Sequence, residues 1–140
     1  NTNFSKQAIP NENDIVWCGS IFTHINVSDT QILLDMLTRS LSKDGRLFVT
    51  LHGEFVADRI RNREKSYNLR ESDMVGLLTD YDRDGFAFQP YPGAVGYGIS
   101  VCTENQFTLF AYKSGLDKVG YMKRAWGGHQ DVVVLKRQKE

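Results

Sequence analysis

The stretch from Asp14 to Gly53 constrains the fold of the chain more than any other part of the sequence. It begins with the apolar run DIVWCGSIFTHI, continues with the helical pattern SDTQILLDMLTRSLSKDG, and ends with a second apolar run, RLFVTLHG. Apolar runs that a helix connects are typical of parallel strands buried on both faces of a sheet. The stretch therefore predicts one βαβ unit. Its crossover should be right-handed, so the loops after both strands should open on one edge, where ligands bind.

The helix inside this unit is predicted from about Asp29 to Lys43. Ser28 and Gln31 have the spacing of a capping box, in which both side chains satisfy backbone amides at the helix start. Gly45 stands where a left-handed residue commonly ends a helix. Between these signals the apolar residues form one stripe, namely Ile32, Leu33, Met36, Leu37 and Leu41.

Residues 54–103 predict short elements rich in aromatic side chains. EFVADRIRNREKSYN has helical spacing of its apolar residues, and SDMVGLLTDY predicts a second short helix that Gly76 weakens. FAFQPYPGAVGYGISVC ends in a strand predicted near Tyr97 to Cys102. The segment DYDRDG has the Asp spacing of a calcium loop, but its twelfth position is Tyr91 rather than the required Glu. We therefore interpret it as a solvated acidic turn.

The last part of the chain predicts a helix and a β-hairpin. Thr103 begins a second capping-box pattern, which predicts a helix from about Glu104 to Ser114 that stops at Gly115. Gly127-Gly128 is a hairpin signal, because it separates two strand-like runs. These runs are Lys118 to Trp126 and Gln130 to Lys136.

The order and spacing of these segments resemble the C-terminal half of class I S-adenosylmethionine-dependent methyltransferases. The βαβ unit resembles the family's fourth strand, following helix and fifth strand, and DKVGYMKRAWGGHQDVVVLKR resembles its closing hairpin. The resemblance implies an α/β fold with a Rossmann-like sheet that is mostly parallel and ends in one antiparallel hairpin strand. It also implies a single domain over residues 1–140, with residues 54–103 as a lid over the acceptor site.

The family's first half is not recognisable. A glycine-rich turn after the first strand and an acidic residue that binds the cofactor ribose are typical of it. Here only NTNFSKQAIPNEN precedes the first predicted strand, and we read residues 1–13 as a loop. The chain also begins at Asn1 rather than Met. We interpret it as the C-terminal part of a methyltransferase-like domain, either as a fragment or as a truncated relative.

The resemblance implies S-adenosylmethionine as cofactor and a set of residues that line its pocket. These residues follow the first predicted strand and are Cys18, Gly19, Ser20, Ile21, Phe22 and His24. The alternative is a helix-entry loop in which Phe22 fills the core and Thr23 caps a turn. Both interpretations remain open from the sequence.

The three histidines are the candidate proton acceptors. His24 follows the first strand of the unit, His52 ends the second and His129 follows the glycine turn, so all three are expected at the ligand edge. A histidine with a pKa near neutral can take a proton from an acceptor hydroxyl during methyl transfer. His52 is the first choice as catalytic base and His129 the second. Their spacing does not favour a metal site.

A group of aromatic residues also has two interpretations. It either forms an apolar acceptor pocket or makes up the small core of the lid itself. The group consists of Phe86, Phe88, Tyr91, Tyr97 and Trp126.

The composition of the chain limits which classes of binding partner and which cellular compartment are expected. The chain has 140 residues, enough for one domain with a core, and its 17 basic and 17 acidic residues balance. Nucleic acid or an anionic membrane is therefore not the expected main partner. Cys18 and Cys102 are expected to be free and buried rather than disulfide-bonded, which fits a reducing compartment. With no apolar run long enough for a membrane span, we expect a cytoplasmic protein.

Three functions remain in view from the sequence. The first is methyl transfer to an unidentified oxygen or nitrogen of a small-molecule or protein acceptor, with this chain as an incomplete part of the enzyme. The second is a non-catalytic interaction module that has lost cofactor binding. The third, half of a nicotinamide-dependent Rossmann enzyme, is disfavoured by the closing hairpin. A half-sheet would expose an edge strand, which favours a homodimer.

Overall fold

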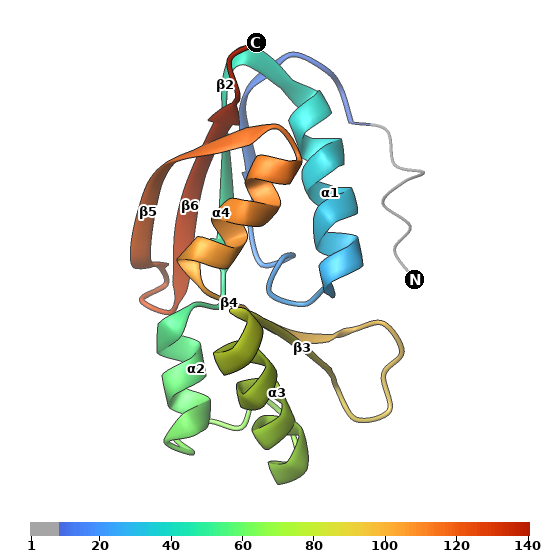
Figure 1. Ribbon diagram of the computed structural model, residues 1–140, viewed down its shortest axis with the longest axis vertical. Helices are drawn as coiled ribbons and strands as arrows, with labels where there is room; N and C mark the ends of the chain where they lie inside the picture. Colours follow the sequence, from blue (N-terminus) through green and yellow to red (C-terminus); the bar gives the residue numbers. More distant parts are fainter. Residues whose placement is uncertain (1–8) are drawn as a thin grey trace.

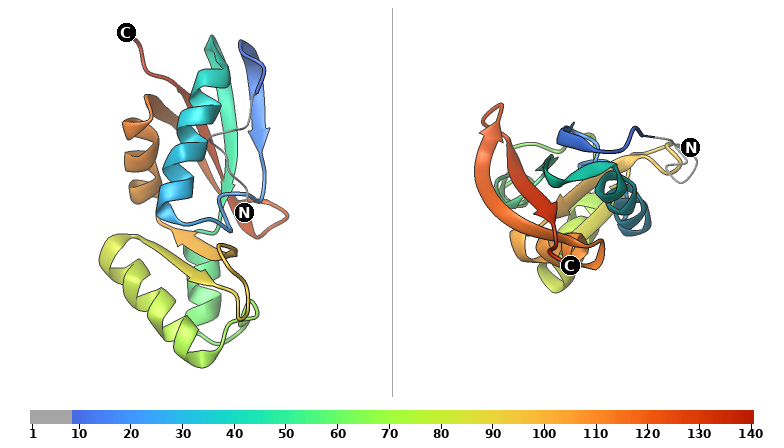
Figure 2. Two further views of the ribbon diagram at one scale, coloured as in Figure 1. Left: turned by 90° about the vertical axis from the view of Figure 1, so that its right-hand side faces the viewer. Right: turned by 90° about the horizontal axis from the view of Figure 1, so that it is seen from above.

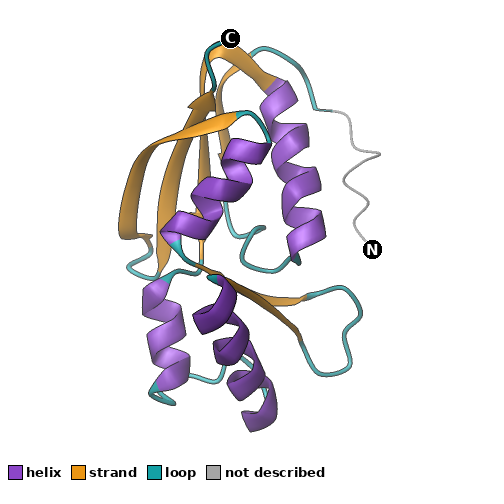
Figure 3. Ribbon diagram, viewed as in Figure 1, coloured by secondary structure: helices purple, strands orange, loops and turns teal. Residues whose placement is uncertain are grey.

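The computed structural model of the chain describes residues 9–140 (Figure 1). Residues 1–8 of the loop predicted at the start of the chain lie outside this range. Residues 9–12 are confirmed as a loop, whereas Asn13 already belongs to a strand. The strands are β1 (Asn13–Cys18), β2 (Leu41–Leu51), β3 (Phe86–Pro90), β4 (Gly98–Cys102), β5 (Leu116–Trp126) and β6 (Gln130–Arg137). The helices are α1 (Val27–Ser40), α2 (Glu54–Arg61), α3 (Glu71–Asp84) and α4 (Glu104–Lys113), and Figure 3 shows how they are placed among the strands.

The main sheet has the strand order β1-β2-β6-β5. β1 and β2 are parallel and joined by α1, so the predicted βαβ unit is confirmed. β6 lies between β2 and β5 and is antiparallel to both, as the predicted closing hairpin requires. The prediction of a mostly parallel sheet is wrong. Only β6 runs against the other strands, but its internal position makes two of the three strand pairs antiparallel.

Helix α1 begins at a different cap from the predicted one. The side chain of Asn26, not Ser28, accepts a hydrogen bond at the helix start, from the backbone N–H of Asp29 at 2.8 Å. Gln31 does not reach back to a cap. Its Nε2 donates to the carbonyl oxygen of Phe110 at 3.0 Å instead, which ties α1 to α4. The Gln31 side chain, which the local pattern assigned to a cap, therefore makes a long-range contact instead.

Helix α1 also ends earlier than predicted, at Ser40, and β2 begins at once with Leu41. Leu41 is extended and only 1% exposed, and the side-chain amide of Asn13 donates to the Ser40 carbonyl at 2.9 Å. Gly45 is part of β2 rather than a left-handed stop. A Cβ atom there would lie 2.6 Å from the Asn13 carbonyl oxygen, so Gly45 allows β1 to approach β2 closely.

One face of the main sheet carries the core, and the helices of residues 9–140 leave the other face uncovered. Both α1 and α4 lie on the same face (Figure 2, left), where they enclose leucine, valine and phenylalanine side chains such as Leu34, Leu47 and Phe107. The opposite face holds Trp17 and Trp126, each 46% exposed, with their ring centroids 4.8 Å apart. A second cluster of buried residues, including Val56, Leu77 and Ile99, lies within residues 54–103.

Residues 54–103, which we call the insertion, contain α2, α3 and a two-stranded sheet of β3 and β4. Both short helices and the strand near Cys102 are confirmed, whereas β3 was not predicted. The acidic turn predicted for DYDRDG is wrong, because these residues form the last turn of α3, which ends at left-handed Gly85. The carboxylates of this segment form ion pairs with arginines and are not merely solvated. One such pair joins Arg61 and Asp82 at 2.7 Å.

The remaining predicted elements are confirmed. Thr103 caps helix α4, because its hydroxyl accepts from the Gln106 N–H at 3.2 Å, and left-handed Gly115 follows the helix end. Gly127 and Gly128 both have positive φ in the turn between β5 and β6. Cys18 and Cys102 are free and buried. Across residues 9–140, the length and hydropathy of every helix fall short of those of a membrane span.

Candidate functional site

The ends of β1 and β2 and the β5–β6 turn meet at one edge of the main sheet, beside the insertion. His24 follows β1, His52 follows β2, and His129 lies in the turn. The ring centroids of His24 and His52 are 6.0 Å apart, and those of His52 and His129 are 5.4 Å apart. Their predicted position on a common edge is therefore confirmed. We call these three residues the histidine cluster.

Strand β4 of the insertion holds two of these histidines by side chain and backbone. Nδ1 of His24 lies 2.8 Å from the Gly98 carbonyl oxygen, and Nδ1 of His52 lies 3.2 Å from the Ser100 carbonyl oxygen. The His52 carbonyl accepts in turn from the Cys102 N–H at 2.9 Å. Because a carbonyl oxygen can only accept, we assign the ring hydrogen to Nδ1 in both histidines. This assignment leaves each Nε2 with a lone pair when the ring is neutral.

His52 is the most enclosed member of the cluster, with 5% of its surface exposed. Burial, followed by the charges of His129 and His24, lowers the pKa of His52 from 6.5 to about 3. Its imidazole is therefore neutral near pH 7 and is a weak base. It can accept a hydrogen bond at that pH, but it holds a proton only briefly.

His129 is half-buried and bonded to a tyrosine of the insertion. Its Nε2 and the hydroxyl oxygen of Tyr67 are 2.7 Å apart, and the two rings stack with centroids 5.7 Å apart. Burial lowers the pKa of His129, and the nearby positive charges of Lys65, Arg59 and Arg124 lower it further. Tyr67 was not singled out from the sequence, where it stands alone between polar residues.

The aromatic group does not form one unit, and Phe86 and Trp126 fit neither predicted role. Tyr97 stacks on His24 at a centroid distance of 5.1 Å, and Tyr91 lies 6.1 Å from the same ring, so both belong to the site. Phe86 packs against Phe110 of the main core instead. Trp126 lies on the open face of the sheet, against Trp17. Phe88 is in β3, with an intermediate exposure.

The six residues implied to line the cofactor pocket differ in accessibility. Cys18 and Phe22 are 5% and 3% exposed and pack in the core, as the helix-entry interpretation of Phe22 required. The residues between them follow β1 at the edge that holds the histidine cluster: Gly19 is half-buried, Ser20 is exposed and Ile21 is 39% exposed. Ser20 has a positive φ, and its N–H donates to the Thr50 hydroxyl at 2.8 Å. The sixth residue, His24, belongs to the histidine cluster.

A buried carboxylate near the cluster was not assigned a role from the sequence. Asp131 of β6 is 2% exposed and accepts from the Tyr121 hydroxyl and from the Arg124 N–H, the latter at 2.8 Å. It also lies against Gly53, where a Cβ atom would be 1.9 Å from Asp131 Oδ2. These contacts join residues from β2–α2, β5 and β6, so they follow from tertiary packing.

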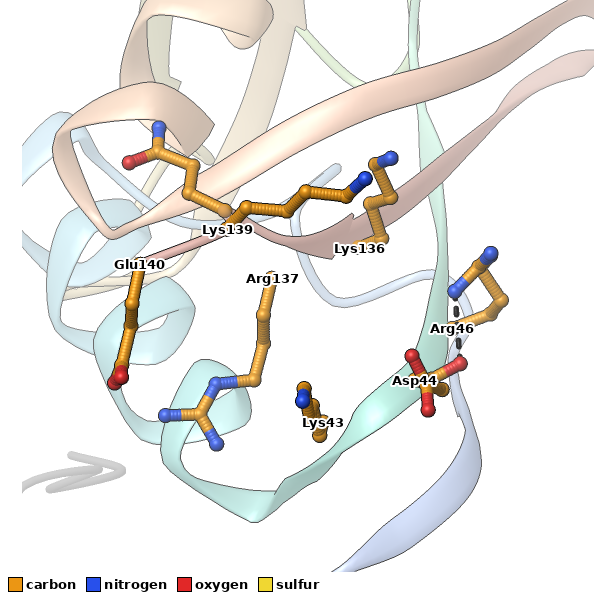
Figure 4. A pocket seen from close by; sticks show the side chains of 8 residues that line it. Lys43, Asp44, Arg46, Lys136, Arg137, Lys139 and Glu140 are labelled. Carbon is orange, nitrogen blue, oxygen red and sulfur yellow. Dashed lines mark hydrogen bonds between the residues drawn. The ribbon is translucent and has the colours of Figure 1, made fainter.

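A recess of about 670 Å³ lies far from the histidine cluster, where β2 begins and β6 ends (Figure 4). Its lining is mainly basic: Lys43, Arg46, Lys136, Arg137 and Lys139, with Asp44, Gln138 and Glu140. Because His52 lies beyond the other end of β2, this recess is separate from the candidate site. Within residues 9–140, groups of three or more side chains suited to a metal ion are absent.

Comparison with known proteins establishes the fold. No protein-family model and no curated protein sequence matches this chain. Among solved structures, the mitomycin 7-O-methyltransferase MmcR matches with 18% identity and a TM-score of 0.60 over 96% of this chain and 32% of that protein. Human N-acetylserotonin methyltransferase in complex with S-adenosylmethionine matches with 13% identity and a TM-score of 0.60, over 98% and 32% of the two chains.

A third solved structure is an N-methyltransferase. The 1,6-didemethyltoxoflavin-N1-methyltransferase of Burkholderia thailandensis, with its substrate and S-adenosylhomocysteine bound, matches with 11% identity and a TM-score of 0.62, over 97% of this chain and 48% of that one. The chain thus has a class I S-adenosylmethionine-dependent methyltransferase-like fold. It spans between a third and a half of the length of these three proteins.

Proposed function

We propose that this chain is the acceptor-side part of an S-adenosylmethionine-dependent methyltransferase, which transfers a methyl group to an oxygen or nitrogen of a small-molecule or protein acceptor. The observation that supports this most is the histidine cluster, which lies beside the insertion at the ligand edge of a methyltransferase-like fold. Catalysis of this reaction depends mainly on positioning the two reactants in line. If the histidine cluster holds the acceptor in line with the methyl group, this chain makes a sufficient contribution to catalysis.

The residues present fit one wall of a cofactor site. Gly19, Ser20 and Ile21 follow β1 with accessible surface, while Cys18 and Phe22 can contribute only backbone atoms. Among residues 9–140, no glycine-rich turn links a first strand to a helix ahead of β1. We propose that another part of the domain supplies the contacts to the ribose and the methionine end.

The proposed chemistry assigns His52 as the group that receives the acceptor proton. When bound, the cofactor would supply the methyl group from its sulfonium, and Gly19, Ser20 and Ile21 would hold it. His52 would accept a hydrogen bond from the acceptor at Nε2 and receive the proton that the acceptor loses. Because the pKa of His52 is about 3, the imidazole orients the proton and passes it on to water. His129 lies beside His52, with ring centroids 5.4 Å apart, and contacts the Tyr67 hydroxyl through Nε2.

A non-catalytic interaction module is the second candidate. It is favoured by the open face of the sheet, where Trp17 and Trp126 form an apolar surface, and by β1, which is an edge strand. Such a surface commonly binds another protein. In that case the loop after β1 would serve only to enter α1.

Calorimetric titration of S-adenosylhomocysteine into the chain, at a measured oligomeric state, separates the two candidates. Micromolar binding that Ile21→Arg abolishes would support the transferase, because Ile21 is an accessible residue of the loop after β1. Val95→Arg is the matched control, since Val95 is 91% exposed in the β3–β4 loop. Binding that Ile21→Arg leaves unchanged would favour the interaction module. Undetectable binding would mean that this chain alone lacks the ribose and methionine contacts, as the transferase proposal also allows.

A further inference from the structure

Two basic segments that are far apart in the sequence meet at the end of the main sheet that is remote from the histidine cluster. Leu47 of β2 pairs with Leu135 of β6 in antiparallel register, so the residues before Leu47 lie beside those after Leu135. The first segment is KDGR, residues 43–46, and the second is KRQKE, residues 136–140. Side chains of both segments line the recess of about 670 Å³ (Figure 4). The fold thus concentrates positive charge that the balanced composition of the whole chain conceals.

The recess carries an excess of positive charge. Its lining consists of five cationic side chains, two carboxylates and one amide, which leaves three positive charges in excess. None of the five cations forms an ion pair with another residue of the range 9–140. A concave surface lined by charge of one sign focuses the electric field and raises the local concentration of the opposite ion. The recess therefore attracts anions.

The two arginines of the recess are held with the same edge open. Nη1 of Arg46 donates to the carbonyl oxygens of Asp44 and Gly45, at 2.8 and 3.2 Å. Nη1 of Arg137 donates to the Leu41 carbonyl oxygen at 3.2 Å. In both side chains, Nε and Nη2 have no hydrogen-bond partner among the described residues. These two nitrogens form an edge of the guanidinium that binds two oxygens of one anionic group at once.

The segment that follows β6 is anchored as well. The backbone N–H of Gln138 donates to the Gly115 carbonyl oxygen at 2.9 Å, and its side-chain amide donates to the Tyr112 carbonyl oxygen at 3.2 Å. These bonds attach the segment to the turn between α4 and β5. Because the backbone on both sides of the recess is fixed, less conformational entropy is lost when its side chains bind a ligand.

The lining selects a compact anion with several charges. All eight lining side chains are charged groups or amides, so the recess offers no aromatic ring on which a base of single-stranded nucleic acid could stack. Its volume is that of a small-molecule site. A single carboxylate cannot neutralise three excess charges. Linked phosphate groups carry more charge in a small volume, and the oxygens of each group match the edge of a guanidinium.

We propose that this recess binds the linked phosphate groups of a small polyphosphate, with the open edges of Arg46 and Arg137 on phosphate oxygens. The lysines of the recess surround the same groups and are Lys43, Lys136 and Lys139. The site is independent of the methyl transfer proposed above, because it lies at the other end of β2. The phosphate chain is either free or part of a nucleotide, and the experiment distinguishes these two sources.

Calorimetric titration of the 140-residue chain tests the proposal at about 50 mM salt, where surface charges are weakly screened. The probes are tripolyphosphate, ATP, orthophosphate and the acidic peptide hexaglutamate. We expect tripolyphosphate to bind at least about tenfold more tightly than orthophosphate or hexaglutamate, and to bind more weakly as salt is added. Binding of ATP no tighter than that of tripolyphosphate indicates a free phosphate chain, and tighter binding of ATP indicates a nucleotide. Orthophosphate or hexaglutamate binding as tightly as tripolyphosphate, or no binding of tripolyphosphate, would overturn the proposal.

Variants that remove charge locate the site. Lys43→Gln combined with Lys139→Gln changes two exposed side chains and should weaken binding of tripolyphosphate about tenfold. Arg137→Lys keeps the charge but removes the open edge, and should weaken binding about threefold. Lys123→Gln combined with Arg83→Gln is the matched control, because it removes two charges from exposed residues outside the recess, and it should leave the affinity unchanged. An equal loss in this control, or no loss in the two recess variants, would contradict the assignment.

Discussion

At the scale of single residues, the candidate site combines chemistry with anchoring. His24 and His52 each use one ring nitrogen to hold β4, and within residues 9–140 the other nitrogen has no hydrogen-bond partner. The same side chains thus dock the insertion onto the sheet and present lone pairs at its edge. A substitution that removes the ring would lose both roles, whereas an amide of similar shape would lose only the second. This distinction guides the choice of variants at these positions.

Gly53 and Gly76 are expected to respond to alanine in opposite ways. A Cβ atom at Gly53 would lie 1.9 Å from Asp131 Oδ2, so Gly53→Ala should destabilise the chain by about 1–3 kcal/mol through overpacking. At Gly76, in the interior of α3, the nearest atom would be 4.0 Å away, so Gly76→Ala should stabilise by about 0.5–1 kcal/mol. Urea unfolding measures both. Equal midpoints for the two variants would show that the contact with Asp131 has no such cost.

Acidification is expected to destabilise the chain through His52. The pKa of this residue is about 3 in the folded chain and 6.5 when exposed, so between these values the unfolded state binds more protons. The stability that neutral His52 maintains is complete above pH 6.5 and is lost progressively below it, on the order of 3 kcal/mol by pH 4.

The matched comparison for this effect is His52→Asn, which cannot titrate but keeps a donor for Ser100. Its unfolding free energy, measured by urea titration at several pH values, should fall less than that of the wild type between pH 6.5 and pH 4. Carboxylates titrate in both proteins, so the difference between the two curves isolates His52. Parallel curves would rule out the low pKa.

At the scale of elements, α1 shows how neighbours change the ends of a helix. Its apolar stripe was predicted correctly, because the stripe follows from the helical period alone. Its start and stop were not. Asn26 caps the helix through a local bond from the Asp29 N–H, whereas Gln31 and Gly45 take part in contacts that exist only in the folded chain. The sequence alone specifies the apolar stripe of the helix, whereas its ends also depend on the residues that pack around it. Its caps are consequently a sharp test of the observed structure.

Asn26 and Ser28 provide a matched pair for that test. Asn26→Ala removes the side chain that accepts from the Asp29 N–H and should cost about 1 kcal/mol of stability. Ser28→Ala, within the first turn, should change stability by less than about 0.5 kcal/mol, as exposed substitutions usually do. Thermal or urea unfolding of the two variants decides between the caps. A larger loss for Ser28→Ala would restore the capping box expected from the sequence.

The site was only partly predictable at this scale. The place of His24, His52 and His129 on one edge followed from strand order, because the loops after β1 and β2 and the closing turn must meet there. Tyr67 could not be found, because it reaches His129 from a connection between α2 and α3 whose path depends on tertiary packing. β3 was missed because its residues alternate poorly and gain their order from pairing with β4.

At the scale of the whole molecule, the open sheet face dominates the expected behaviour in solution. Trp17, Trp126 and Met122 lie nearly half exposed on the main sheet, and Ile15 is 73% exposed on the edge strand β1. Edge strands and apolar patches both promote association, and the balanced charge of the chain does not oppose it. The surface is therefore expected to be covered by another copy or another chain.

We expect the isolated chain to self-associate through this face. Trp17→Lys places a charge on the edge strand and should weaken association by at least about tenfold, while leaving the unfolding free energy of the monomer nearly unchanged. Val95→Lys, on the exposed β3–β4 loop, is the control and should have no effect. Sedimentation equilibrium over a range of concentrations measures both. A wild-type chain that stays monomeric throughout would contradict the expectation.

The sequence by itself determined the order of the elements, the βαβ unit, the closing hairpin and the edge at which the histidines gather. These follow from local periodicity, turn residues and strand order, which act over short distances along the chain. Only the tertiary structure decided that β6 enters between β2 and β5, that Phe22 fills the core, and that β4 fixes the tautomers of His24 and His52. These outcomes join residues that are distant in sequence, and their energy comes from burial and hydrogen bonds that exist only once the chain has folded.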